Sequence, residues 1–122
     1  MSKNLVVINA DKTVREAVQM MADRNLGSLL VRKDGQIVGI LEESDIIKNL
    51  LSKDLNAYVV KVETVMSVPY VIGEDMSDND ASDLMVKQNV RRLIVSDGYA
   101  IVGIISMKDL VRPVYSGRSF WS

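Results

Sequence analysis

The sequence of 122 residues contains neither cysteine nor histidine. Without cysteine the chain can form no disulfide and no zinc–thiolate site, and it has no thiol nucleophile. Without histidine it lacks the usual general base and the commonest metal ligand. The acidic residues also match no calcium-binding loop, so we expect no metal site. These absences predict a protein that is not an enzyme and requires no cofactor.

Long hydrophobic runs and an excess of charge of one sign are missing as well. No run reaches the roughly 18 apolar residues of a membrane span. The first residues lack the long apolar core of a signal peptide, so we expect a cytoplasmic location. The 15 basic and 16 acidic side chains give a net charge of −1, which argues against a nucleic-acid partner. With 48% hydrophobic and 25% charged residues, the composition is typical of an ordered globular protein.

The chain contains an internal repeat. Residues 5–51 align with residues 69–115 without a gap. The run Ile37-Val38-Gly39-Ile40 recurs as Ile101-Val102-Gly103-Ile104 within a shared apolar pattern. An ungapped tetrapeptide in that setting indicates a duplication.

Each copy has the same predicted order of elements, β-α-β-β-α. In the first copy an apolar strand over Leu5–Ile8 precedes a Thr13-x-x-Glu16 capping box. The helix that follows repeats apolar residues at i, i+3, i+4 and i+7. This spacing predicts four buried side chains: Val14, Ala17, Val18 and Met21.

A hairpin and a second helix complete each copy. The dipeptides Asp34-Gly35 and Asp97-Gly98 lie between apolar runs, which is the strongest short-range hairpin signal. The second helix is expected over Asp45–Leu51 in the first copy and over Lys108–Val111 in the second. Both hairpin strands are apolar over successive residues, so both faces of each sheet should be buried.

We therefore predict an α+β (α/β-like) fold of two repeats related by a pseudo-twofold axis and packed sheet to sheet. The helices of a repeat would cover one sheet face and the sibling repeat the other, leaving two pseudo-equivalent clefts between the repeats. We place the first repeat and its linker at residues 1–60, the second repeat at 61–115 and a C-terminal tail at 116–122.

The doubled unit, in which strand, glycine and strand lead to a helix that starts near an aspartate, resembles the cystathionine-β-synthase (CBS) domain. Two such domains in tandem resemble a Bateman module. The resemblance covers about residues 2–115. It is carried by Gly39 and Asp45 in the first copy and by Thr64–Pro69, Val90–Val95 and Gly103–Asp109.

This resemblance implies a regulatory, ligand-binding function. In the CBS family the cleft between repeats commonly binds an adenine nucleotide (AMP, ADP or ATP) and occasionally S-adenosylmethionine. Such modules act in energy sensing and other regulation, signal to a partner protein and tend to form homodimers. Neither the ligand nor the regulated protein is identified by the sequence.

The motif Ser106-x-x-Asp109 offers a carboxylate for ribose hydroxyls and a hydroxyl near phosphate, at a helix start that favours anions. The same residues also form a plain capping arrangement. The aspartate recurs as Asp45, but position 42 is a glutamate, a poor N-cap. We therefore expect that the two copies do not share a capping geometry, and that Asp45 accepts ribose hydroxyls with Ser44 beside it.

Arg91 and Arg92 begin an apolar strand, where two adjacent cations either line a solvated strand edge or bind phosphate oxygens. The first copy has Gly27 and Ser28 at these positions. The two copies therefore differ in charge at this point.

In the resembling family each cleft takes its ribose aspartate from one repeat and part of its phosphate contacts from the other. Carried over, one cleft combines Ser44, Asp45, Thr64, Val68, Pro69, Arg91 and Arg92. The other combines Ser106, Lys108 and Asp109 with Asn4, Leu5, Gly27 and Ser28. We favour the cleft with the two arginines for a charged phosphate, although Glu42 would repel it there.

Two alternatives remain open at the level of sequence. The chain could be a structural module for dimerisation or partner docking with degenerate ligand sites, a hypothesis that Glu42 favours. The tail over Val114–Ser122 is rich in aromatic residues and lies outside the repeat. It is either a frayed end or a strip that packs on a partner or on a second copy.

Overall fold

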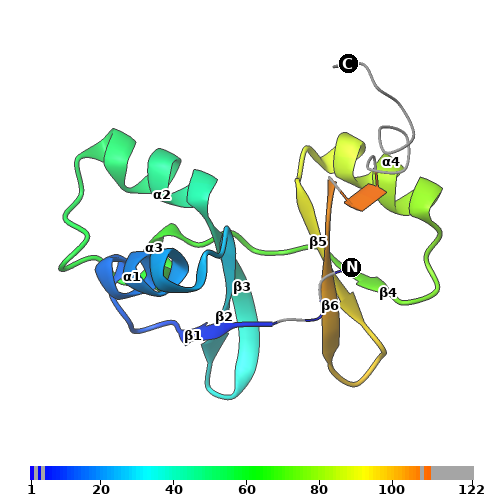
Figure 1. Ribbon diagram of the computed structural model, residues 1–122, viewed down its shortest axis with the longest axis horizontal. Helices are drawn as coiled ribbons and strands as arrows, with labels where there is room; N and C mark the ends of the chain where they lie inside the picture. Colours follow the sequence, from blue (N-terminus) through cyan, green and yellow to red (C-terminus); the bar gives the residue numbers. More distant parts are fainter. Residues whose placement is uncertain (2, 4, 108, 111–122) are drawn as a thin grey trace. The chain divides into compact units, whose positions relative to one another are not determined.

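A computed structural model describes residues 1, 3, 5–107, 109 and 110, which form two compact units (Figure 1). One unit spans Leu5–Pro69. The other contains Met1, Lys3 and the described residues from Tyr70 onward. Among the described residues no helix is long and apolar enough to cross a membrane.

The first unit has a three-stranded sheet in the order β1-β2-β3, with β1 parallel and β3 antiparallel to β2. Its helices α1, α2 and α3 lie on one side of this sheet (Figure 1). The elements are β1 (Val7–Asn9), α1 (Val14–Arg24), β2 (Ser28–Lys33), β3 (Gln36–Glu42), α2 (Glu43–Asn49), the short 3-10 helix η1 (Leu51–Lys53) and α3 (Val62–Val65).

The second unit repeats this plan. Its sheet has the order β4-β5-β6, again with one parallel and one antiparallel pair. The elements are β4 (Val71–Gly73), α4 (Asp78–Gln88), β5 (Arg92–Ser96) and β6 (Ile101–Ser106). The predicted α+β class with two similar halves is confirmed. The second helix of this copy, expected over Lys108–Val111, lies partly outside the described residues.

The long helices of the two units have the same ends. Thr13 Oγ1 accepts a hydrogen bond from the Glu16 N–H (3.2 Å), and Ser77 Oγ accepts one from the Asp80 N–H (3.1 Å). Each helix ends at an asparagine with a left-handed φ of 54°, a conformation that asparagine tolerates better than most residues. The predicted cap at Thr13 is confirmed.

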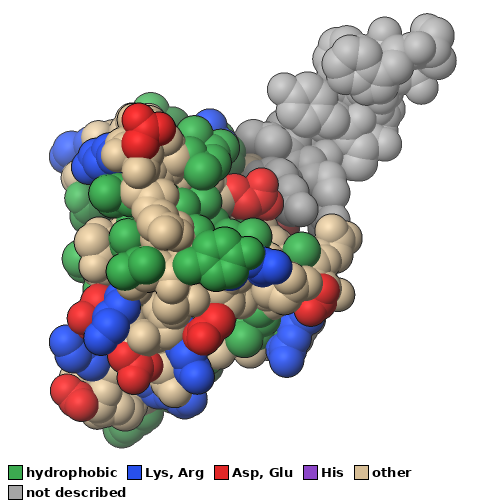
Figure 2. Space-filling view, turned by 90° about the vertical axis from the view of Figure 1, so that its left-hand side faces the viewer, with side chains coloured by type: hydrophobic (Ala, Val, Ile, Leu, Met, Phe, Trp, Pro, Cys, Tyr) green, Lys and Arg blue, Asp and Glu red, His purple; other side chains and the backbone are tan. Residues whose placement is uncertain are grey.

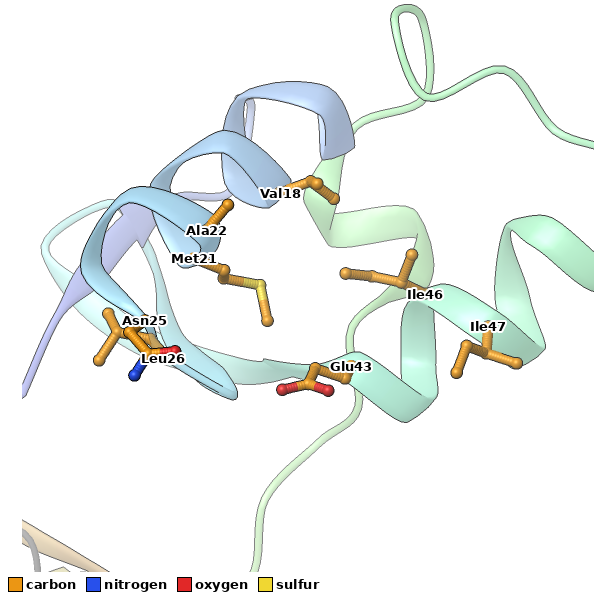
Figure 3. Close-up of a pocket in the computed structure, with 8 residues that line it drawn as sticks. All are labelled: Val18, Met21, Ala22, Asn25, Leu26, Glu43, Ile46 and Ile47. Carbon is orange, nitrogen blue, oxygen red and sulfur yellow. The ribbon is translucent and has the colours of Figure 1, made fainter.

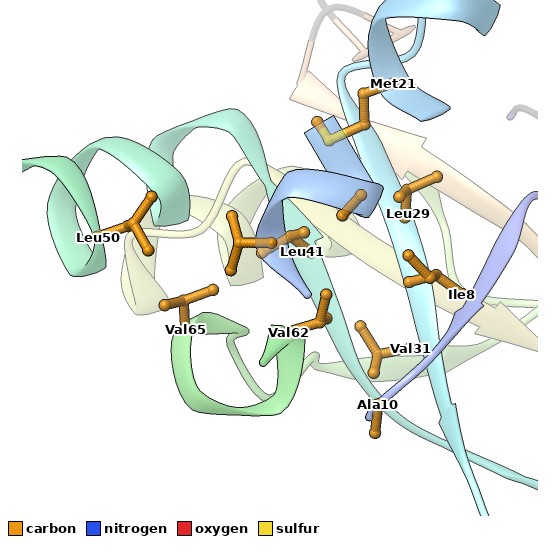
Figure 4. Close-up of a cluster of buried hydrophobic side chains, with 11 residues drawn as sticks. Ile8, Ala10, Met21, Leu29, Val31, Leu41, Leu50, Val62 and Val65 are labelled. Atoms are coloured by element: carbon orange, nitrogen blue, oxygen red, sulfur yellow. The ribbon is translucent and has the colours of Figure 1, made fainter. Parts of the chain in front are cut away.

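The core of the first unit lies between its sheet and its helices (Figure 4). It contains Ile8, Ala10, Val14, Ala17, Met21, Leu29, Val31, Leu41, Leu50, Val62 and Val65. The predicted burial of Val18 is wrong, because this side chain is 36% exposed. It lies at the edge of the helical stripe, beside a groove between α1 and α2 (Figure 3).

Both faces of the middle strands β2 and β5 are buried, as predicted, whereas β6 is mostly half-buried. Leu29 and Leu30 are adjacent in β2 and therefore point to opposite faces, and each is 1% exposed. Leu93 and Ile94 show the same behaviour in β5. That the sibling repeat covers the second face stays a prediction.

The two hairpin turns differ. Asp34 and Gly35 both have positive φ (52° and 78°), as a two-residue type I′ turn requires. In the hairpin turn of the second unit only Gly98 has positive φ (98°), and the turn is longer. There the Asp97 carboxylate accepts hydrogen bonds from the N–H groups of Tyr99 (2.8 Å) and Ala100 (2.9 Å). These bonds lower the pKa of Asp97.

The glycine of the duplicated tetrapeptide has a packing role in both units. A Cβ on Gly39 would collide with the thioether of Met66, and a Cβ on Gly103 would collide with that of Met1. Met66 lies in the segment that follows α3 and runs beside β3. The next residue, Ser67, exchanges two backbone hydrogen bonds with Ile40 (both 2.9 Å). The absence of a side chain at Gly39 therefore lets this segment pack closely on β3.

Candidate functional site

Asp45 is buried at the start of α2, where its carboxylate is held by hydrogen bonds from the same unit. Its side chain is 6% exposed, and it is the one buried charged residue in the described part of the chain. Oδ2 accepts a hydrogen bond from the Glu42 N–H (2.9 Å), and Oδ1 accepts one from Ser67 Oγ (2.5 Å). Buried charge is costly unless it is paired or hydrogen-bonded, and these two donors meet that requirement.

Asp109 holds the equivalent position in the second unit. Its Oδ2 accepts hydrogen bonds from the Ser106 N–H (2.9 Å) and from Ser106 Oγ (3.1 Å). The backbone bond matches that of Asp45 in length and in spacing. Our prediction that the copies do not share a capping geometry is therefore wrong. The shared bond runs from a backbone N–H to the aspartate, so the side chain at position 42 or 106 does not decide it.

In each unit the start of the middle strand lies beside the end of the last strand of the sheet. Ser28 pairs with Glu42 in the first sheet, and the Glu43 N–H donates to the Gly27 carbonyl (3.2 Å). This contact brings Gly27 and Ser28 to the same sheet end as Asp45.

The second sheet has the same register with different side chains. Arg92 pairs with Ser106, and the Met107 N–H donates to the Arg91 carbonyl (2.9 Å). The predicted residues Arg91, Arg92, Ser106 and Asp109 therefore meet at one end of one sheet.

These two sheet ends have opposite electrostatic character. In the first unit the neighbouring residues are Gly27 and Ser28 on one strand and three acidic residues, Glu42, Glu43 and Asp45, on the other side. In the second unit two guanidinium groups take the place of Gly27 and Ser28. Arg91 is exposed and Arg92 is half-buried. An anion would be repelled at the first end and attracted at the second.

The remaining predicted site residues are spread over the described chain or lie outside it. Ser44 is half-buried beside Asp45, Thr64 is exposed on α3 and Val68 is 79% exposed. Pro69 and Leu5 are half-buried. Asn4 and Lys108 lie outside the described residues. The joining of residues from both repeats in one cleft stays a prediction.

Ser67 was not among the predicted site residues, although it contacts the buried carboxylate directly. It lies in the segment Thr64–Pro69, which the sequence comparison with the CBS pattern includes. No local signal shows that this segment pairs with Ile40 of β3 and so brings its hydroxyl to Asp45.

Comparison with known proteins agrees with the repeated fold. The family model of the CBS domain matches residues 1–52 and 62–116. CBS domain-containing protein YhcV of Bacillus subtilis is 32% identical over 120 residues, which are 98% of this chain and 85% of that protein.

Two solved structures are also similar. A candidate signal-transduction protein with CBS domains from Burkholderia ambifaria superposes with a TM-score of 0.85 at 29% identity, over 97% of this chain and 88% of that one. The hexameric CBS-CP12 protein of bloom-forming cyanobacteria gives 0.82 at 27% identity, over 91% and 66%.

The two matched segments and the two similar units define a tandem pair of CBS domains. The chain belongs to the CBS-domain family. Proteins of this family are generally regulatory and not catalytic.

Proposed function

We propose that the chain is a non-enzymatic regulatory module that binds AMP, ADP or ATP between its CBS repeats and signals to a partner protein. The observation that carries this proposal is the group formed by Arg91, Arg92, Ser106 and Asp109 at one end of the second sheet. It combines cations that suit phosphate with a carboxylate that suits hydroxyl groups.

The arginines are the proposed phosphate ligands. A guanidinium group donates two parallel hydrogen bonds to phosphate oxygens, and such charged bonds are among the strongest that proteins make. Arg91 is exposed and can reach a ligand without breaking a packed structure. Binding should therefore strengthen from AMP to ATP and weaken as salt is added.

The ribose would be bound by an aspartate, for which there are two candidates. Asp45 was the prediction for the cleft that contains the arginines, and Asp109 is the aspartate of their own unit. A carboxylate has about four acceptor sites, so Asp45 can accept a further hydrogen bond beside those from Glu42 and Ser67.

A ligand changes the signal only by binding one arrangement of the module more tightly than another. We propose that the nucleotide favours one packing of the two repeats, or of a homodimer, and that the regulated protein binds that state. This would make the module an energy sensor in the cytoplasm.

Isothermal calorimetry tests the proposal. ATP, ADP, AMP and S-adenosylmethionine are titrated into the full chain, and then into Arg91→Gln with Arg92→Gln. We expect heat with at least one adenine nucleotide and at least a tenfold loss of affinity in the double variant. Lys61→Gln, at an exposed lysine of the first unit, is the matched control and should bind as the wild type. No binding of any nucleotide, or unchanged binding in the double variant, contradicts the proposal.

Single Asp45→Asn and Asp109→Asn variants identify the ribose ligand. The variant that loses affinity for adenosine as well as for ATP identifies the aspartate that contacts the sugar. If both variants bind as the wild type, neither aspartate has the proposed role.

The second candidate function is dimerisation or partner docking with degenerate ligand sites. Exposed apolar side chains favour it: Leu51 is 60%, Tyr58 71% and Val59 70% exposed. Hydrophobic side chains gather among charged ones on the face shown in Figure 2. The similar cyanobacterial CBS-CP12 protein is hexameric. Light scattering tests this candidate: we expect the wild type to self-associate and a Tyr58→Ser, Val59→Ser variant to lose that association.

A further inference from the structure

The two hairpin turns contain the same dipeptide, Asp34-Gly35 in the first unit and Asp97-Gly98 in the second. An aspartate followed by glycine can rearrange spontaneously, because the amide nitrogen of the glycine attacks the side-chain carboxyl group of the aspartate. Glycine permits this reaction best, since it has no side chain to shield its nitrogen. The two turns hold the two reacting groups in different ways, so the structure distinguishes between the two sites.

In the second turn hydrogen bonds occupy both reacting groups. The Asp97 carboxylate accepts bonds from the N–H groups of Tyr99 (2.8 Å) and Ala100 (2.9 Å). The Gly98 N–H donates to Ser96 Oγ (3.0 Å). The carboxylate is thus bound to the residues after the glycine, while the attacking nitrogen is held by the residue before the aspartate. These bonds must break before the nitrogen can reach the carboxyl carbon.

The first turn lacks such bonds. Within the described part of the chain, neither the Asp34 carboxylate nor the Gly35 N–H forms a hydrogen bond. Asp34 is exposed, and a Cβ built on Gly35 would have nothing within 4 Å. The side chain of Asp34 can therefore turn toward the next nitrogen without losing a contact.

We propose that Asp34 is a site of spontaneous modification to isoaspartate and that Asp97 is protected from it. The Gly35 nitrogen attacks Cγ of the protonated Asp34 side chain and forms a C–N bond. The proton of the nitrogen and the hydroxyl of the carboxyl group leave together as water, which closes a succinimide ring. Water then adds to the former main-chain carbonyl carbon and breaks its bond to nitrogen. The net reaction consumes no other reactant, because one water is released and one is taken up.

Protonation gives a further difference between the two sites. The neutral carboxyl group is the reactive form, since its hydroxyl can leave. The backbone hydrogen bonds to the charged form of Asp97 lower its pKa, so less of this group is protonated at any given pH. This effect adds to the protection that the hydrogen-bond geometry provides.

Isoaspartate at position 34 should disturb the tip of the hairpin of the first unit. The modified main chain runs through the aspartate side chain and gains one carbon atom, which a two-residue type I′ turn does not accommodate. Lys33 and Gln36 pair at this tip, and Lys33 Nζ forms an ion pair with Glu63 (3.2 Å). Ser28 and Glu42 pair at the opposite end of the hairpin. The modification is therefore remote from Asp45 and independent of nucleotide binding, and this proposal can fail without affecting the proposed function.

Ageing of the folded full chain at neutral pH tests the proposal. Samples taken over several weeks are digested, and mass spectrometry with electron-transfer fragmentation distinguishes isoaspartate from aspartate in the two peptides. We expect isoaspartate to accumulate at residue 34 at least about tenfold faster than at residue 97, because Asp97 and Gly98 must first lose their hydrogen bonds. In urea, where both turns are unfolded, the two rates should be similar.

Two variants test each site separately. Ser96→Ala removes the acceptor of the Gly98 N–H and should speed the reaction at residue 97 without changing it at residue 34. Asp34→Glu keeps the charge but would require a larger ring, so it should abolish the reaction in the first turn. Ser52→Ala, at an exposed serine outside both turns, is the matched control and should change neither rate.

The comparison of folded and unfolded wild-type chain remains decisive if a variant does not fold. The proposal is overturned if the folded chain accumulates as much isoaspartate at residue 97 as at residue 34, or none at residue 34. It is also overturned if the ratio of the two rates is the same in urea as in the folded chain. An unchanged rate at residue 97 in folded Ser96→Ala contradicts the protection of the second turn.

Discussion

The hydroxyl of Ser67 donates a 2.5 Å hydrogen bond to Oδ1 of Asp45. Ser67 lies in the segment that pairs with β3 at Ile40. This bond ties the chain that leaves the first unit to the buried carboxylate at the start of α2. A movement of that segment would therefore change the hydrogen bonding of a predicted ligand residue.

Ser67→Ala should lower the free energy of unfolding by about 1–3 kcal/mol, because one oxygen of a buried carboxylate loses its donor. Urea denaturation measures the change. Ser52→Ala, which removes an exposed hydroxyl that bonds the Lys48 carbonyl, is the control and should have a much smaller effect. Equal effects of the two substitutions would show that the Asp45 bond contributes little.

Gly39→Ala should destabilise the first unit by about 1–3 kcal/mol, since the new methyl group would occupy space that the Met66 thioether fills. Shortening Met66 to alanine in the same chain should relieve the collision. The double variant should therefore lose less stability than the sum of the single variants, as measured by urea denaturation. Simple additivity would contradict the close packing of these two residues.

The pKa of Asp97 should lie below the ordinary aspartate value, because backbone N–H groups of Ala100 and Tyr99 bond its charged form. A carboxylate with a lowered pKa in the folded state stabilises the fold above its unfolded pKa. That contribution is lost as the pH falls through the folded pKa. NMR titration of the side-chain carboxyl measures the value directly, and Asp97→Asn should remove this part of the acid dependence of stability. A pKa at or above the ordinary value would contradict the turn geometry.

Replacing the N-cap Thr13 by alanine should cost about 1 kcal/mol, because the Glu16 N–H loses its acceptor. Ser77→Ala should have a similar effect through Asp80, since the two helices begin in the same way. Thermal unfolding of both variants measures the loss. Thr13→Ser keeps the acceptor and should be nearly neutral. If Thr13→Ser lowered the stability of the fold as much as Thr13→Ala does, a capping role of this side chain would be contradicted.

The repeat made much of the fold predictable. The duplicated tetrapeptide, the caps and the Asp-Gly turns define strands and helices that the structure reproduces within a few residues. Burial of Val18 was wrong because periodicity defines a stripe but not its width. The width depends on how closely α2 approaches α1, which the sequence does not encode locally.

The site was predictable only in part, for a related reason. Recurrence identified Asp45 and Asp109, and hairpin register explains why Arg92 lies opposite Ser106. The role of Ser67 depends on a pairing with Ile40, which is remote in sequence and has no turn signal between the two. The shared capping bond was not predicted because its donor is the backbone N–H of residue 42, whereas the prediction rested on the glutamate side chain, a poor N-cap.

The melting temperature of the full chain with millimolar ATP, compared with the same concentration of adenosine, tests the nucleotide-sensing account most directly. A ligand that binds the folded state at 100 times its Kd stabilises it by about 2.7 kcal/mol, which raises the melting temperature by several degrees. We predict that ATP gives such a rise, that adenosine gives a clearly smaller one, and that Arg91→Gln with Arg92→Gln removes the difference. An unchanged melting temperature with both compounds, or equal shifts with and without the phosphates, would contradict the account.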